Sequence, residues 1–251
     1  MDILQVIKER KMYRGTFQDR KIDRKTILQI IETARWAPSG HNSQPWQFVI
    51  VDDKKIISDL VAIAVERFNE VQKTRKDLEK LVEIWCRWLR WSDTELEAAG
   101  DGMYMNTMSQ ATWEQMRKTR STEELRAYVM EVLSPQVRAT QINGSPCVLL
   151  ALLDKAIEIP NFSQDIMALT GIGGAIQNLR LAIHALGLGA HEVSLLWDVP
   201  ETRIKIKQYL GIPAHYDIVS AMRIGYPGDP TPTHTTHVRK PVDKLVHWNE
   251  Y

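Results

Sequence analysis

The sequence is poor in cysteine, with two in 251 residues, Cys86 and Cys147. Cys86 lies in a tryptophan-rich stretch with helical spacing, and Cys147 lies far away at the start of an apolar run. A disulfide framework or a cysteine metal site needs more thiols at closer, recurring spacings. We therefore expect two buried, reduced thiols rather than a disulfide or a metal pair.

Long apolar runs and a charge excess are also missing. No segment approaches the roughly 20 apolar residues that a membrane span requires. The N-terminus, MDILQVIKERK, is of mixed polarity and lacks the apolar core of a signal peptide. The formal net charge of +1 gives no general electrostatic reason to bind nucleic acid. These absences predict a cytoplasmic protein without membrane or nucleic-acid partners.

Several catalytic signatures are absent as well. The sequence has no Walker loop, no serine nucleophile elbow and no paired metal-binding histidines, so no metal site is expected. A Gly-x-Gly-x-x-Gly turn after a strand is missing too, which argues against a dedicated dinucleotide-binding domain. The glycines of GIGGAI, residues 171–176, open a predicted helix, and helix packing explains them.

Apolar periodicity predicts helices that alternate with strands. Asp23 is expected to cap a helix that runs to about Trp36. The buried face of that helix is predicted to consist of Ile27, Ile30, Ile31 and Ala34. Gly187 and Gly189 are expected to end the longest helix in left-handed conformations. Helices are predicted at residues 3–9, 23–36, 54–138 with a break near 99–105, 165–186 and 201–210, and strands at 46–51, 147–153, 191–196 and 217–225. Strands separated by helices favour a layered α/β arrangement.

Residues 10–14, Arg-Lys-Met-Tyr-Arg, concentrate three cations at the end of a predicted helix. Cations spaced this closely repel one another unless an anion lies among them, and the planar donor fork of arginine suits phosphate. The alternative is a solvated helix end, where cations complement the helix dipole. The spacing by itself leaves both interpretations open.

The loop PSGHNSQPW, residues 38–46, joins a predicted helix to a buried strand. Its Ser, Asn and Gln side chains can donate and accept hydrogen bonds, as the edge of a flat polar heterocycle such as a flavin requires. Gly40 allows the backbone to come close to such a ring. The alternative is an Asx-type turn that only positions the strand. His41 taken alone is more typical of a surface or hydrogen-bonded histidine than of a catalyst.

This loop resembles that of the nitroreductase-like FMN-dependent oxidoreductase family, whose members carry Pro-Ser-small-x-Asn-x-Gln-Pro-Trp at this position. Three further segments are similar to family motifs in the right order, so the resemblance covers most of the chain. They are RKMYRGTF at 10–17, similar to the opening box; GIGGAIQNLRLAIHALGLG at 171–189, similar to the central dimer helix; and IGYPGD with Arg239-Lys240-Pro241, similar to the closing segment.

The resemblance implies an α+β fold, a three-layer α/β sandwich in which helices flank a central mixed, mostly antiparallel sheet. It implies a single domain over residues 1–251 with a helical lid insert at approximately 74–138. It also implies an extended C-terminal tail that crosses to a partner subunit, in a homodimer with shared active sites.

The resemblance further implies FMN as cofactor and NADH or NADPH as electron donor. The implied cofactor contacts of the opening box are Arg10, Lys11, Met12 and Arg14, joined by Arg239 from the tail at the phosphate and ribityl chain. Pro38, Ser39, Gly40 and Asn42 would meet the isoalloxazine of the other subunit. Backbone amides of Val193, Ser194 and Leu195 would approach flavin N5 and its neighbouring carbonyl.

Two positions depart from the family pattern. Met12 stands where Ser or Asp is usual, so one polar contact to FMN is missing. Ser194 and Leu195 replace a pair that is often glycine, so the surroundings of N5 would be tighter. Cations and backbone amides carry most of the implied binding, so neither departure removes FMN.

Between residues 73 and 138 the chain holds more sequence than compact relatives need, rich in Trp and Met. We expect a helical subdomain with an aromatic core, which in this family covers the flavin. Tyr104 and Trp113 are candidate substrate contacts of this lid. A cover of Met and Trp would favour a flat apolar substrate, because Met adapts its shape and Trp stacks.

The leading hypothesis is an FMN-dependent oxidoreductase that passes reducing equivalents from NAD(P)H to a small, electron-poor, aromatic acceptor. Within the same fold, the alternatives are an enzyme that cleaves the flavin with oxygen and a reductive dehalogenase. In the dehalogenase, Glu97, Tyr104, Arg117 and Lys118 of the lid would clamp a zwitterionic amino acid. An alternative of another class is a flavin-binding protein without turnover.

Overall fold

The computed structural model describes residues 2–72, 123–124, 127, 134–160, 162–228 and 242–249. Contacts divide the chain into two compact units, one of Met1–Lys73 and Pro135–Thr231 and the other of Thr74–Ser134 and Pro232–Tyr251. The predicted lid falls almost entirely outside the described residues, and so does Cys86. The single-domain organisation therefore stays a prediction. In the second unit, the longest described stretch contains a short 3₁₀ helix, η3 (Val242–Lys244).

The first unit is built on a four-stranded sheet in the order β1-β2-β4-β3. The strands are β1 (Trp46–Val51), β2 (Cys147–Asp154), β3 (Gly189–Glu192) and β4 (Tyr216–Gly225). All three pairings are antiparallel, with Trp46 opposite Leu153, Cys147 opposite Ile224 and Gly189 opposite Gly225. The predicted α+β fold is confirmed, and among the described strands the sheet is wholly antiparallel rather than mixed.

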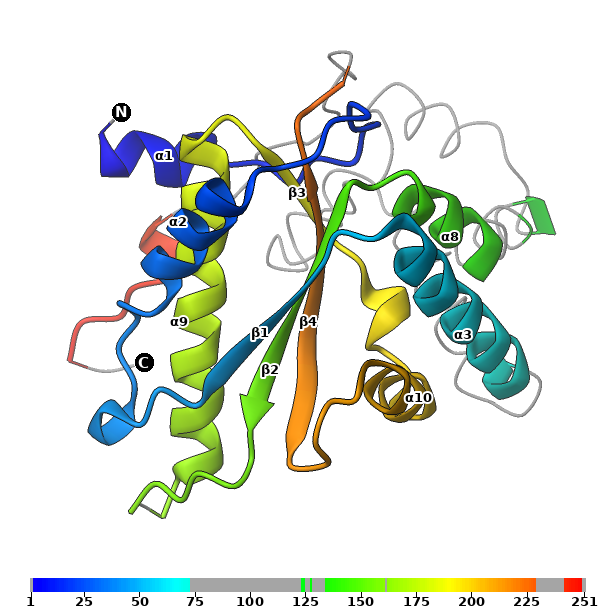
Figure 1. Ribbon diagram of the computed structural model, residues 1–251. Coiled ribbons are helices and arrows are strands. Elements are labelled where there is room, and N and C mark those ends of the chain that lie inside the picture. The colour runs from blue at the N-terminus through cyan, green and yellow to red at the C-terminus, as the bar shows by residue number, and fades with distance from the viewer. Residues whose placement is uncertain are drawn as a thin grey trace. The chain divides into compact units, whose positions relative to one another are not determined.

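Helices cover both faces of this sheet, which gives the three predicted layers (Figure 1). One face carries α1 (Ile3–Glu9), α2 (Arg24–Ala34) and α9 (Gln164–Ala185). The other carries α3 (Lys54–Gln72), α8 (Pro135–Asn143) and α10 (Pro200–Leu210). Because side chains alternate along a strand, β2 supplies both cores. Leu149 packs in the cluster on the α9 side and Leu150 in the cluster on the α3 side, both fully buried.

Local signals placed most of these elements correctly. Asp23 caps α2 as expected: its carboxylate accepts from the Thr26 amide at 2.9 Å and from the Thr26 hydroxyl at 2.7 Å. Such a cap contributes about 1 kcal/mol. The helix ends at Ala34, short of the predicted Trp36, because the Trp36 and Ala37 amides turn back to the carbonyls three residues earlier. Cys147 is a buried free thiol, as predicted, and burial raises its pKa to about 12.

Two boundary predictions after α9 were wrong. Gly187 does end the helix in a left-handed conformation, with φ of 73°, but Gly189 lies within β3. The strand predicted at 191–196 ends at Glu192, and residues Ser194–Leu196 form a 3₁₀ helix, η2. The chain leaves the sheet because the amides of Trp197 and Asp198 both donate to the Ser194 carbonyl.

A further departure concerns α8, which continues five residues beyond the predicted end at 138, to Asn143. The turn that follows is closed by Ser145, whose amide donates to the Ile142 carbonyl at 3.0 Å and whose hydroxyl donates to the Gln141 carbonyl at 3.1 Å. These bonds let the helix run directly into β2.

Among the described helices, α9 alone is long and apolar enough, by length and composition, to cross a membrane. Its most apolar stretch has a mean hydropathy of 1.3, yet 33% of that stretch is buried. In the fold α9 lies against the sheet and against α2 (Figure 1), which is the position of a central helix in a layered domain. A cytoplasmic location stays a prediction of the sequence.

Candidate functional site

The basic segment that follows α1 lies along the sheet edge formed by β3. The Tyr13 amide donates to the Ala190 carbonyl at 2.8 Å, and the Tyr13 hydroxyl donates to the Thr16 carbonyl at 2.6 Å and accepts from the Gly228 amide at 3.0 Å. A Cβ added to Gly189 would lie 2.7 Å from the Tyr13 ring. Only glycine therefore fits at the start of β3, because the ring lies directly on its backbone.

The predicted cofactor contacts of this segment differ in burial. Arg10 and Met12 are half-buried, whereas Lys11 and Arg14 are exposed. Nearby protein atoms still desolvate the Arg14 guanidinium enough to lower its pKa. Within the described chain, no carboxylate forms a hydrogen bond or ion pair with Arg14. Arg239 lies outside the described residues, so its predicted approach to this segment stays a prediction.

Sequence reasoning missed two residues beside this segment, Arg223 on β4 and His191 on β3. Arg223 is 2% exposed and its Nε donates to His191 Nδ1 at 3.2 Å. Its terminal nitrogens donate to the carbonyls of Gln141 at 2.7 Å and Gly15 at 2.9 Å. The signal in the sequence is an arginine inside the apolar stretch Ala221–Ile224 near the end of β4.

These groups place positive charge at one end of the sheet. Desolvation lowers the pKa of Arg223 to about 10; Tyr13 opposes this shift and the nearby Arg14 adds to it. Desolvation, followed by the charges of Arg223 and Arg14, lowers the pKa of His191 to about 3, so His191 is neutral at pH 7. Two arginines thus lie close together, and no carboxylate of the described chain accepts a hydrogen bond from either. An anion such as phosphate is the chemistry that this arrangement favours.

The loop after α2 packs against the first half of α9. A Cβ added to Gly171 of α9 would lie 3.3 Å from the Ser39 side chain. A Cβ added to Gly40 of the loop would lie 3.2 Å from the Met167 sulfur. Gly174 would likewise meet Ala37 at 3.6 Å. The glycines of GIGGAI at 171 and 174 therefore serve helix–loop packing, as predicted. Pro38 and Ser39 belong to this contact, whereas Asn42 is exposed.

The same loop has an unusual backbone. His41, Asn42 and Gln44 have positive φ values of 52°, 52° and 47°. Such conformations are uncommon outside glycine and cluster at functional sites. The Ser39 hydroxyl stabilises the loop by accepting from the Gln44 amide at 3.0 Å. His and Asn adopt positive φ more readily than most other residues, so Gln44 is the least expected of the three.

The third predicted segment, residues 193–195, leaves β3 at the sheet edge. The Val193 amide already donates to the Ala221 carbonyl at 2.8 Å. The amides of Ser194 and Leu195, the first two residues of η2, have no acceptor within the described part of the chain. Of the three predicted donors to a flavin, these two are available and Val193 is occupied by the sheet.

Glu192 fixes the start of that segment. Its carboxylate accepts from Arg180 at 2.7 Å, from the Ser220 hydroxyl at 3.0 Å and from the Ala221 amide at 3.2 Å. The carboxylate thereby joins α9, β3 and β4 just before the chain turns into η2. This half-buried ion pair holds the two available amides in place.

The structure does not bring the predicted segments together within one chain. The basic segment lies by the start of β3, next to the C-terminal end of α9, and the loop at 38–42 lies by Met167 near its N-terminal end (Figure 1). At 1.5 Å per residue, the 20 residues from Met167 to Gly187 span about 30 Å. One chain therefore cannot close both segments around one small ring.

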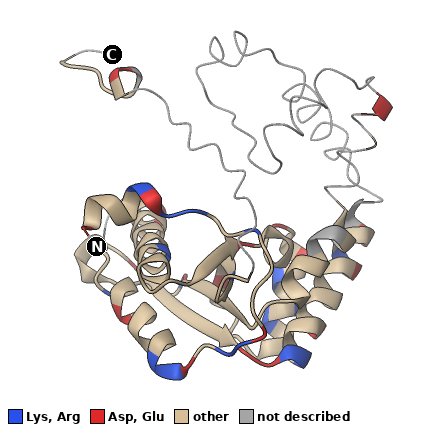
Figure 2. Ribbon diagram, turned by 90° about the horizontal axis from the view of Figure 1, so that it is seen from above, with Lys and Arg blue, Asp and Glu red and all other residues tan. Residues whose placement is uncertain are grey.

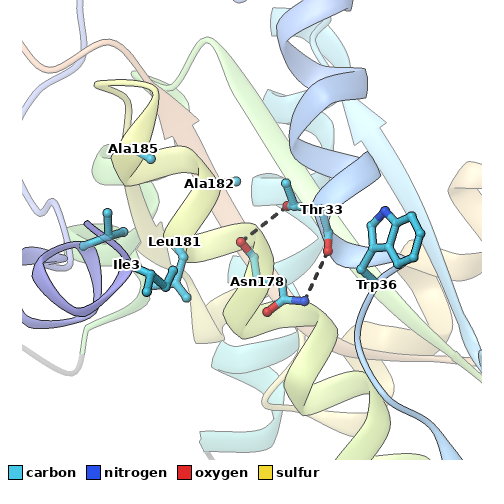
Figure 3. Close-up of a pocket in the computed structure, with 8 residues that line it drawn as sticks. Ile3, Thr33, Trp36, Asn178, Leu181, Ala182 and Ala185 are labelled. Carbon is cyan, nitrogen blue, oxygen red and sulfur yellow. Dashed lines mark hydrogen bonds between the residues drawn. The ribbon is translucent and has the colours of Figure 1, made fainter. Parts of the chain in front are cut away.

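An open groove of about 470 Å³ runs between α1, α2 and α9 (Figure 3). Apolar side chains line most of it, among them Ile3, Val6, Trp36, Leu181 and Ala182. At its floor the Asn178 side chain donates to the Thr33 carbonyl at 3.2 Å. Leu4 on α1, and Ile166 and Leu169 toward the N-terminal end of α9, are also more than half exposed. This outward apolar surface is unusual for a monomer that faces only water.

Comparison with known proteins identifies the family that has this fold. The model of the nitroreductase family matches residues 7–226. YdgI of Bacillus subtilis, named as an NAD(P)H nitroreductase, is 33% identical over 73 residues, which cover 29% of this chain and 34% of YdgI. A Methanothermobacter thermautotrophicus protein, named as an NADH dehydrogenase/NAD(P)H nitroreductase, is 23% identical over 234 residues, 91% of this chain and 79% of that protein.

Solved structures show the same fold. The crystal structure described as FMN and NADPH-dependent nitroreductase NfnB from Sphigopyxis sp. strain HMH superposes with a TM-score of 0.65 at 18% identity, covering 100% of both chains. At this identity the likeness concerns the fold. The family match extends from α1 to the end of β4 and so includes the three segments described above. This match covers most of the chain, and the chain therefore belongs to the nitroreductase family.

Proposed function

We propose that this protein binds FMN and passes reducing equivalents from NADH or NADPH to a small, electron-poor aromatic acceptor such as a nitroarene. The observation that carries this proposal is the pair of close arginines, Arg14 and Arg223, with no carboxylate partner in the described chain. Such a pair fits a phosphate monoester. The available amides of Ser194 and Leu195 fit the electron-rich edge of a reduced flavin, where backbone donors stabilise negative charge. The residues present therefore fit FMN.

When bound, FMN would supply the redox chemistry, and the chain would supply binding, orientation and electrostatics. Arg10, Lys11 and Arg14 would hold the phosphate and ribityl chain. Arg180 and Glu192 would keep the segment at 193–195 in position. No side chain of the described residues is needed as a nucleophile for this role.

We further propose a homodimer in which two copies share each site. The separation of about 30 Å along α9 supports it, because a loop of one copy and a basic segment of the other could then meet at one flavin. The outward apolar surface of α1, α2 and α9 supports it as well, since a second copy would bury it. The crossing of the C-terminal tail to the partner is part of the same proposal.

The first test is an absorption spectrum of the purified protein under argon before and after NAD(P)H is added. We expect flavin absorption that NAD(P)H bleaches and that a nitroarene restores. Absence of bound flavin after reconstitution with FMN contradicts the proposal. Binding without bleaching supports a non-catalytic flavin protein, and iodide release from a halogenated amino acid supports the dehalogenase alternative.

Subunit sharing is tested with mixed dimers of two inactive variants. Arg14→Gln weakens the basic segment, and Asn42→Asp places a negative charge in the loop. If sites form between copies, a heterodimer of these two variants holds one intact site and recovers about half of the wild-type FMN content. The control heterodimer, Arg14→Gln with Arg10→Gln, recovers none. Recovery that is absent from both mixtures excludes shared sites.

A further inference from the structure

Arg223 has an unusual set of partners for a buried arginine. It is 2% exposed, and all of its acceptors among the described residues are neutral. They are the Gln141 carbonyl at 2.7 Å, the Gly15 carbonyl at 2.9 Å, His191 Nδ1 at 3.2 Å and the Tyr13 carbonyl at 3.5 Å. Its guanidinium carbon also lies 4.8 Å from the centre of the Phe17 ring. Buried arginines are normally paired with carboxylates, because desolvated charge is costly.

The two carbonyls of the N-terminal segment that face Arg223 belong to the residues on either side of Arg14. Arg223 thus joins the backbone around Arg14 to β4, and through Gln141 to α8. A neutral donor could hold these carbonyls without the cost of burying a charge. The retained charge therefore needs a reason beyond the hydrogen bonds.

Neighbouring charges increase that cost. Arg14 lies close enough to disfavour the charged form of Arg223, and His191 stays neutral beside it. For comparison, Arg203 on the same side of the sheet has the Asp217 carboxylate at 3.3 Å. Within the described residues, no carboxylate performs this role for Arg223. An anion bound beside Arg14 would supply the missing charge.

We propose that Arg223 is a positioning residue for a phosphate monoester: it holds the backbone on both sides of Arg14 and adds its own unbalanced charge beneath the bound anion. This inference rests on the proposed function, in which the phosphate is that of FMN. The role differs from that of the exposed cations at 10–14, because Arg223 acts from inside the sheet through the segment that it holds.

The test compares FMN with riboflavin, which lacks the phosphate, on apoprotein by quenching of flavin fluorescence. In Arg223→Met we expect the ratio of FMN to riboflavin affinity to fall at least about tenfold, as for the loss of a nearby charge at an effective dielectric constant of about 20. Arg223→Lys keeps the charge and should recover most of the ratio. An unchanged ratio in Arg223→Met, or no recovery in Arg223→Lys, overturns the inference.

A second pair of variants leaves Arg223 in place and so guards against misfolding. His191→Asp puts a carboxylate beside Arg223 Nε and supplies the missing counter-ion, whereas His191→Asn is its neutral match. We expect the FMN preference to fall in His191→Asp and to stay within about threefold of wild type in His191→Asn, since only the former neutralises the cation. Equal ratios in the two variants overturn the inference.

Two controls separate the sources of failure. Wild-type protein that binds neither flavin contradicts the proposed function itself, whereas wild type with a strong FMN preference that Arg223→Met retains contradicts only this inference. The KM values for NADPH and NADH are measured in parallel, because NADPH also carries a phosphate monoester. A change confined to the NADPH-to-NADH ratio assigns the site to the nucleotide and overturns the FMN assignment.

Discussion

The helices α3 and α9 cover opposite faces of one sheet, and their outward surfaces differ: that of α3 is charged and that of α9 is largely apolar. On α3 four outward charges form ion pairs, Lys55 with Asp59 at 2.7 Å and Arg67 with Glu70 at 2.6 Å. Figure 2 shows charged residues along the helices of that side. The longer α9 contains two residues of the Asp, Glu, Lys and Arg types, Asp165 and Arg180. Its Leu169 side chain is 53% exposed. Water suffices to cover the first surface. The second surface is apolar enough to pack against another protein, which is why we propose that the dimer contact lies on α9.

The largest effect should come from a charge placed on the apolar surface. Leu169 on α9 and Ile204 on α10 are both 53% exposed, so Leu169→Glu and Ile204→Glu form a matched pair. Burying an unpaired charge costs about 3–5 kcal/mol, so Leu169→Glu should raise the dimer dissociation constant at least about 100-fold. Ile204→Glu should leave it unchanged. Sedimentation equilibrium measures both, and equal behaviour of the two variants would remove the contrast between the faces.

The two cores beneath these helices should respond alike. Leu149 and Leu150 are fully buried neighbours on β2 that enter the clusters on the α9 and α3 sides. Truncation of either to alanine should lower the free energy of unfolding by about 2–5 kcal/mol. Urea unfolding at one fixed protein concentration compares them. If either variant loses less than about 1 kcal/mol, that core is not packed as described.

The unpaired cations at the sheet edge predict a pH effect. Since His191 has its pKa lowered from 6.5 to about 3, the unfolded chain binds a proton in that range that the folded chain does not. Stability is therefore complete above pH 6.5 and falls toward pH 3, by up to about 1.4 kcal/mol per pH unit. His191→Asn should remove this slope. The free energy of unfolding of both proteins is measured with urea at each pH. If it falls with the same slope in wild type and in His191→Asn, His191 is not held neutral.

The smallest effect concerns Gly173, where an added Cβ meets no atom within 4 Å. In a solvent-exposed helix, Gly→Ala stabilises by about 1 kcal/mol. Against a second copy the same methyl group would occupy contact space and weaken the dimer. Gly173→Ala should therefore raise stability at low protein concentration and weaken association at high concentration. A gain that is equal at both concentrations would show that this part of α9 faces water.

Local signals explain why much of the fold could be predicted. Asp23 caps α2, Gly187 ends α9, and the apolar runs of β1 and β2 are strands, because capping, left-handed glycines and periodicity act within a few residues. The order of the motifs was sufficient to predict the family. The strand predicted at 191–196 was wrong beyond Glu192, because the Ser194 carbonyl turns to accept from the Trp197 and Asp198 amides. The apolar side chains of Leu195 and Leu196 are buried in η2 as they would be in a strand, so their pattern does not tell the two apart.

The candidate site, like the fold, could be predicted from the sequence only in part. The sequence by itself determined which segments carry cations and small polar residues, because residue type is local information. Only the tertiary structure decided that Arg223 reaches the carbonyl of Tyr13, 210 positions away, and that Gly189 makes room for the Tyr13 ring. It alone set the basic segment and the loop at 38–42 at opposite ends of α9. Such contacts join residues distant in the chain, so only sheet order and helix packing determine them.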